Sequence, residues 1–231
     1  MVERRWPWPV SAVLLLVAGL AMARSAHLWW QPCGVAGGVG VDDGACFRRM
    51  DEGSPLAVAA AYSDLTQLIG LALLSAAAAW LVLVLGLRWS WSQRLLLAPL
   101  GLVLALVAVR PEVATSELIV VVDVAVVAAF VGTAIGGGGN PVVAGPDGVD
   151  VWRVWIPLGA VGTFGMIWTM VDHLVMGAWA SPGWGTPPGT GYLGAVVLMA
   201  AAVVTVLLAA GPGRAPARQP SLARSRRMLR A

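Results

Sequence analysis

Six long apolar stretches, separated by short segments rich in polar residues, glycine and proline, dominate the pattern of this 231-residue chain. A helix needs about 20 predominantly apolar residues to cross the hydrocarbon core of a bilayer, and these stretches approach or exceed that length. The pattern therefore predicts an all-α, polytopic integral membrane protein with six transmembrane helices. They span residues 8–27, 61–87, 94–110, 117–136, 154–177 and 191–210, and form one domain over 1–210 that precedes a tail over 211–231.

Composition supports a membrane protein. The chain is 58% hydrophobic and 12% charged, and its mean hydropathy is +0.80. A soluble domain carries about 25% charged residues, so this chain has too little polar surface to cover a water-soluble globule. The lipid bilayer must therefore be the solvent for much of it.

The positions of the basic residues predict the orientation. All of them are arginine, which indicates a GC-rich, bacterial genome. If the N-terminus is cytoplasmic, eleven of the fifteen arginines lie on the cytoplasmic side and four on the other, in agreement with the positive-inside rule. We therefore expect a multi-pass plasma-membrane protein with both termini in the cytoplasm and an external loop over 28–60.

The tail over 211–231 holds six arginines among prolines and serines. We expect it to be disordered and to bind anionic lipid, which attracts basic segments next to the membrane. No nucleic-acid-binding motif accompanies it, so nucleic acid is not an expected partner.

The first 23 residues also allow a second interpretation. Arg4 and Arg5 precede an apolar run that ends in Ala21-Met22-Ala23, and this order is typical of a secretory signal peptide. Cleavage there would leave five helices and an external N-terminus.

The external loop over 28–60 contains both cysteines, Cys33 and Cys46. Disulfides persist in oxidising compartments, and closing a loop of this size stabilises a fold by about 3 kcal/mol. The spacing does not match the Cys-x-x-Cys of redox-active pairs. We therefore predict a structural disulfide.

The segment Leu28-Trp29-Trp30-Gln31-Pro32-Cys33, followed by Cys46, resembles the first extracellular loop of claudins, which has a Leu-Trp pair ahead of two cysteines. Here the gap between the cysteines is longer, and His27 replaces the glycine that precedes Leu-Trp. Claudins also have fewer helices, so no function is carried over from them.

Ionisable residues inside the predicted helices are the candidates for a polar site, because a charge in hydrocarbon costs about 3 kcal/mol on insertion scales. By helical rise both carboxylates lie in the outer third of the membrane, whereas coupled transporters place their site near the midplane. Asp123 could pair with Arg110, and Asp172 could accept from Thr169 or cap local backbone. The candidates are Asp123, Asp172 and His173 within helices, with Arg110, Glu117 and Asp64 at their outer ends.

No cofactor is predicted. Two low-weight alternatives involve the two histidines, which are expected at the same membrane face: a haem between His27 and His173, or zinc held by these histidines and Asp172. No metal-ligand spacing motif supports either, and His173 points about 100° away from Asp172 on a helix.

The sequence contains no catalytic set of Ser, His and Asp, no nucleotide fingerprint and no paired carboxylates. We therefore expect a non-catalytic accessory or assembly subunit that contacts a partner membrane protein or forms a homo-oligomer. Two alternatives remain open at this point: a small-solute or ion transporter or channel that uses Asp123 and Asp172, and a membrane redox protein or enzyme that uses His27 and His173.

Overall fold

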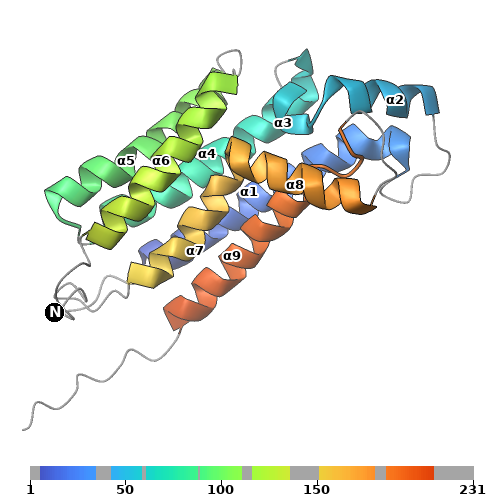
Figure 1. Cartoon of the computed structure of the whole chain (residues 1–231). Coiled ribbons are helices and arrows are strands. Elements are labelled where there is room, and N and C mark those ends of the chain that lie inside the picture. Colours follow the sequence, from blue (N-terminus) through green and yellow to red (C-terminus); the bar gives the residue numbers. More distant parts are fainter. Residues whose placement is uncertain are drawn as a thin grey trace, which may run out of the picture.

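The computed structural model describes residues 6–34, 43–58, 61–87, 89–110, 116–135, 151–179 and 186–210, and all regular structure in these ranges is helical (Figure 1). Its elements are α1 Pro7–Trp30, the 3-10 turn η1 Gln31–Cys33, α2 Asp43–Glu52, α3 Pro55–Val58, α4 Ser63–Gly86, α5 Trp91–Val109, α6 Ser116–Ile135, α7 Val151–Val161, the 3-10 turn η4 Gly162–Phe164, α8 Met166–Trp179 and α9 Tyr192–Ala210.

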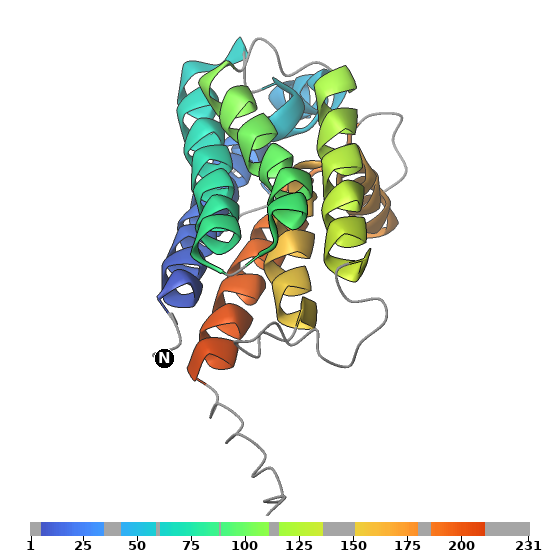
Figure 2. The same ribbon diagram turned by 90° about the vertical axis from the view of Figure 1, so that its left-hand side faces the viewer.

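The long helices form a bundle in which α1 packs between α4 and α9, while α5 packs against α4 and α6 against α5 (Figures 1 and 2). The start of α1 and the end of α9 lie at one end of the bundle. The short helices α2 and α3 lie at the other, and we call η1, α2 and α3 the cap. Apolar side chains from α1, α4, α5, α7 and α9 fill the core, including Leu15, Trp80, Leu100, Leu158 and Leu198.

Glycine at position 19 allows α1 and α9 to approach closely. A Cβ atom there would lie 2.7 Å from Cγ of Met199 and 3.1 Å from the carbonyl oxygen of Ala195. Small residues at helix contacts are typical of membrane bundles, where tight packing rather than hydrophobic exclusion drives association. The first and last helices of the chain are therefore neighbours.

Fewer helices qualify as membrane spans than the six predicted. By length and composition the described residues contain three candidates, Pro7–Cys33, Ser63–Gly86 and Trp91–Val109, or four if the bent pair Arg153–Phe164 and Met166–Ala178 is counted as one span. The remaining two predicted spans correspond to shorter apolar helical segments, Val120–Thr133 in α6 and Tyr192–Leu207 in α9.

The prediction of one continuous helix over 154–177 was wrong. The chain forms α7, breaks at η4 and Gly165, and continues as α8 at an angle of 77° (Figure 1). Gly165 is extended, with φ −84° and ψ 167°, so the i to i−4 hydrogen-bond ladder is interrupted there.

The segment over 28–60 is not a simple loop. Helix α1 continues through Trp30 into η1, and two helices follow, α2 and the single turn α3. Arg49 lies in the last turn of α2, where a cation stabilises the carbonyl end of a helix. The cap is therefore built largely from helices, with the disulfide inside it.

Candidate functional site

The carboxylate of Asp123, on α6, caps the first turn of α8. Its Oδ2 accepts a hydrogen bond of 3.1 Å from the backbone N–H of Ile167, one of the amides that lack an intrahelical partner at a helix start. The negative charge also stabilises the positive end of the helix dipole. A residue from the neighbouring helix α6 thus supplies the hydrogen-bond acceptor that the N-terminus of α8 needs.

Gly165 makes room for the Asp123 carboxylate at the start of α8. A Cβ atom at this position would overlap Oδ1 of Asp123. Because its φ lies in the ordinary negative range, the requirement for glycine here comes from space and not from backbone conformation. The predicted pairing of Asp123 with Arg110 stays a prediction.

Asp172, in the middle of α8, is only 3% exposed. Its Oδ2 accepts a hydrogen bond from the backbone N–H of Gly191, which directly precedes α9. Gly191 has a φ of +106°, a conformation that favours glycine. Of the two partners considered from the sequence, Thr169 or backbone, the structure has a backbone N–H, while the Thr169 hydroxyl donates to the carbonyl of Gly165 at 3.0 Å.

The second oxygen of Asp172, Oδ1, is buried without a hydrogen-bond partner among the described residues. Leaving a buried acceptor unsatisfied costs about 1–3 kcal/mol, and more if it is charged.

A cavity of about 20 Å³ lies beside Asp172, between α1, α4, α8 and the cap. This volume suits one water-sized particle. Its wall combines hydroxyl-bearing residues with apolar side chains, and Trp168 is one of its lining residues. The hydroxyl residues are Ser25, Ser54, Thr163, Thr169 and Thr190.

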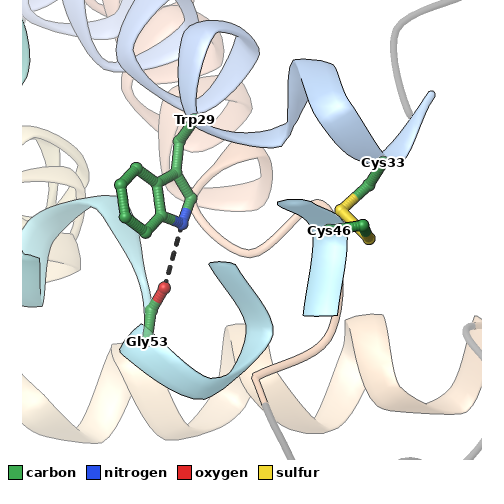
Figure 3. The surroundings of a disulfide bond; sticks show 4 residues. All are labelled: Trp29, Cys33, Cys46 and Gly53. Carbon is green, nitrogen blue, oxygen red and sulfur yellow. Dashed lines mark hydrogen bonds between the residues drawn. A yellow bond between two sulfur atoms is a disulfide. The ribbon is translucent and has the colours of Figure 1, made fainter. Parts of the chain in front are cut away.

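The disulfide between Cys33 and Cys46 is present and joins η1 to α2, with the two Cα atoms 4.8 Å apart (Figure 3). The prediction of this bond is therefore confirmed. Next to it the indole N–H of Trp29 donates to the carbonyl of Gly53 at 3.0 Å. The end of α1 thus holds both ends of α2, one covalently and one by a hydrogen bond.

A polar cluster of Arg49, Glu52 and Tyr62, packed on the Trp29 ring, joins α2 to the residue that precedes α4. The guanidinium carbon of Arg49 lies 3.8 Å from the centre of the Trp29 ring and 4.8 Å from that of Tyr62, a cation–π arrangement. Arg49 also lies 3.6 Å from Glu52, and the Tyr62 hydroxyl donates to Glu52 at 2.8 Å. This hydrogen bond to an anion raises the pKa of Tyr62 above 10.0, and burial adds to the rise.

The cap is also attached to the segment ahead of α9. The backbone N–H of Thr186 donates to the carbonyl of Met50 at 2.8 Å. The buried indole of Trp30 donates to the carbonyl of Thr190 at 2.8 Å. Residues separated by more than a hundred positions in the sequence therefore join both the cap and the end of α1 to the segment ahead of α9.

The two histidines occupy different surroundings from the carboxylates. His173 lies on the exposed face of α8 with Met166, Met170 and Leu174, whereas its neighbour Asp172 is buried, as the helical geometry predicts. His27 is half-buried on α1. Among the described residues no group of three or more His, Cys, Asp or Glu side chains is arranged to hold a metal ion.

The remaining predicted site residues lie at helix ends. Asp64 is exposed in the first turn of α4, and Arg110 follows the last residue of α5. Glu117 belongs to the first turn of α6, but its side chain lies outside the described residues, as do the glycine run over 136–139 and the tail over 211–231.

Several residues that form these sites were not among the sequence candidates. Gly165 and Gly191 accommodate the two carboxylates, and Trp168 lies on the cavity. Trp168 and Asp172 are four residues apart in a helix, a spacing that puts them on one face. That spacing was the one available signal for their association.

Comparison of the chain with protein-family models, with curated proteins and with solved structures gives no match.

Proposed function

We propose that this protein is a non-catalytic accessory or assembly subunit of a membrane complex, which contacts a partner membrane protein through the cap. In this proposal the chain crosses the membrane six times, with α6, α9 and the bent pair α7–α8 as spans beside α1, α4 and α5. Both termini are cytoplasmic and the cap is external. The arginine distribution and the position of the disulfide support this orientation.

The attachment of the cap is the observation that carries the proposal. The disulfide joins α2 to η1, which continues α1, and the Trp29 indole hydrogen bond, the Thr186 backbone hydrogen bond and the Arg49 cluster attach the cap to the rest of the chain. Ordering each residue costs about 1–2 kcal/mol of backbone conformational entropy. A rigid surface binds a partner with less entropy loss on association, so this rigidity suits a contact surface.

Phe47 is the side chain on this surface that best suits contact with a protein. It lies on α2 and is 65% exposed, one residue after the disulfide-bonded Cys46. Aromatic side chains are enriched in the cores of protein interfaces. Its exposure at the end of the bundle that we propose to be outside the membrane favours burial against a partner.

The two intramembrane carboxylates fit the same proposal, because both stabilise the fold. Asp123 caps α8 and Asp172 binds the amide ahead of α9. Each carboxylate thus has a backbone amide of another segment as its partner.

The test is native mass spectrometry of the protein purified from its own membrane in mild detergent, with Phe47→Asp as the variant. We expect a reproducible complex in the unsubstituted protein and its loss in Phe47→Asp. The control is Asp64→Asn, which changes an exposed group at the start of α4 and should leave the complex intact. A monomer with no partner, or a complex that survives Phe47→Asp, contradicts the proposal.

One observation favours a second candidate, an ion or small-solute transporter. Transporters often bind their substrates where a membrane helix is broken, with a helix N-terminus directed at the site. The 77° break between α7 and α8 brings Asp123 to such a terminus. In reconstituted vesicles, Asp123→Asn should then abolish flux, whereas flux equal to that of empty vesicles excludes transport.

A further inference from the structure

The bent pair α7–α8 is too short to cross the hydrocarbon core of a bilayer along one line. Its two arms, Arg153–Phe164 and Met166–Ala178, meet at 77° (Figure 1). The first arm rises about 20 Å at the usual rise per residue, whereas the core is about 30 Å thick. The second arm is also about 20 Å long, but at this angle it advances only about 4 Å along the axis of the first. The pair therefore covers about 24 Å of the thickness.

The hydrogen bond to Asp123 gives the depth of the break independently. In the proposed arrangement α6 begins at the membrane boundary on the side of the cap, and Figure 2 shows its start at that end of the bundle. Asp123 lies seven residues after Ser116, the first residue of α6, which is about 10 Å along the helix. Its carboxylate accepts from the Ile167 N–H at 3.1 Å, so α8 starts at this depth. The length of α7 leaves the same distance of about 10 Å to the boundary.

The side of α8 that faces away from the bundle is apolar. Ile167, Met170 and Leu174 are 62%, 57% and 70% exposed, and their spacings of three and four residues put them on one side of the helix. The only Asp, Glu, Lys or Arg residue in α8 is Asp172, and it is buried. An uncovered apolar side of this kind marks a contact with membrane or protein.

A hollow of about 280 Å³ is open on this side of α8, and its wall is almost wholly apolar. The Thr169 hydroxyl on this wall already donates to the carbonyl of Gly165 at 3.0 Å. Methionine side chains are flexible and adapt to irregular shapes, which suits a mobile hydrocarbon chain. The hollow is lined by Met166, Thr169, Met170, His173 and Leu174.

We propose that α8 lies nearly parallel to the membrane plane, within the leaflet on the side of the cap, and that the hollow holds an acyl chain of a phospholipid. This inference deepens the six-span arrangement proposed above and rests on it. The headgroups begin about 6–10 Å further out than α8, so the uncovered side of the helix meets acyl chains. The rival occupant of the hollow is a second copy of this chain.

The experiment measures the membrane depth of nitroxide labels on single introduced cysteines in the full chain, reconstituted in phospholipid vesicles. The chain has two cysteines and both form the disulfide, so an introduced cysteine is the one thiol that reacts with the label. Labels on Ile167→Cys and Leu174→Cys should differ in depth by about 2 Å, whereas the same separation on an upright helix gives about 10 Å.

The matched control is a pair of labels on α1, at Val10→Cys and Leu16→Cys. Both residues are 40% exposed and lie in the half of α1 nearer its N-terminus, so their depths should differ by about 9 Å. Without this difference on α1, the six-span arrangement and the present inference both fail. With it, a depth difference close to 10 Å on α8 overturns the present inference alone.

Contact with an acyl chain is measured at Met170→Cys, because Met170 lines the hollow. Its label should be accessible to molecular oxygen, which dissolves in hydrocarbon, and shielded from a water-soluble nickel chelate. Access of the nickel chelate would place the hollow in water and overturn the proposal. A label shielded from both reagents would show that a second copy covers the hollow, which overturns the acyl-chain assignment.

Discussion

The carboxylate of Asp123 occupies the space that a side chain on Gly165 would need. The two residues lie 42 positions apart in the sequence, Asp123 on α6 and Gly165 in the break before α8. The carboxylate caps α8 only because residue 165 has no Cβ atom. The break in the predicted fifth helix is thus tied to an acidic residue on α6.

Replacing Gly165 by alanine should destabilise the protein by about 1–3 kcal/mol, the usual cost of forcing an extra group into a packed site. The matched control is Gly159→Ala in α7, where nothing lies within 4 Å of the added atom. That change should be neutral or stabilising by up to about 1 kcal/mol, because alanine is the better helix former. Thermal unfolding in detergent measures both, and equal midpoints for the two variants would contradict the assigned contact.

Replacing Asp123 by alanine should cost about 0.5–2 kcal/mol, as does the loss of other helix caps. Asp123→Asn should cost less, because an amide oxygen still accepts from the Ile167 N–H while the favourable charge at the helix start is lost. Denaturation in the same detergent gives the comparison. An Asp123→Ala variant as stable as the unsubstituted protein would show that the Asp123–Ile167 hydrogen bond contributes nothing measurable to the free energy of unfolding.

Removing the disulfide, as Cys33→Ser with Cys46→Ser, should loosen the cap and leave the bundle formed. Closing a loop with a sequence separation of 13 stabilises a fold by about 3 kcal/mol, and here that stabilisation concerns α2. Amide hydrogen exchange should become faster in residues 43–52 and stay unchanged in the middle of α4, because local opening need not involve the whole molecule. Uniformly faster exchange would mean that the cap and bundle unfold together.

Tyr62 should ionise at a higher pH than free tyrosine, because its hydroxyl donates to Glu52. A pKa raised in the folded state means that the associated stability is complete below the unfolded value of 10.0 and is lost as the pH rises toward the folded value. The chain has two tyrosines, so Tyr192→Phe isolates the signal of Tyr62 in an ultraviolet absorbance titration. Adding Glu52→Gln should lower the midpoint, and an unchanged midpoint would exclude Glu52 as the cause.

The sequence was sufficient to locate most of the long helices. The predicted stretch 61–87 corresponds to Ser63–Gly86, and 191–210 to Tyr192–Ala210, because long apolar runs are helical in lipid and their ends are marked by polar or turn-forming residues. The break at Gly165 was not predicted, because the hydropathy of a stretch reports its composition and not the direction of its helix axis.

The sequence predicted the two carboxylates of the candidate site. It did not predict the groups to which they hydrogen-bond. Asp123 and Asp172 were identified because ionisable groups are rare in apolar helices. Their hydrogen bonds go to Ile167 and Gly191, which are distant in sequence and offer only backbone amides. A backbone amide has no side-chain signature, so only the three-dimensional structure could identify these contacts.

The packing of α1 against α9 has a consequence for biosynthesis. The ribosome delivers α1 well before α9, yet Gly19 of α1 packs against α9 and Trp30 binds the turn just before it. Until α9 has been synthesised, one flank of α1 has no native neighbour. Nascent chains cut short before α9 would therefore expose that flank of α1 to chaperones and proteases.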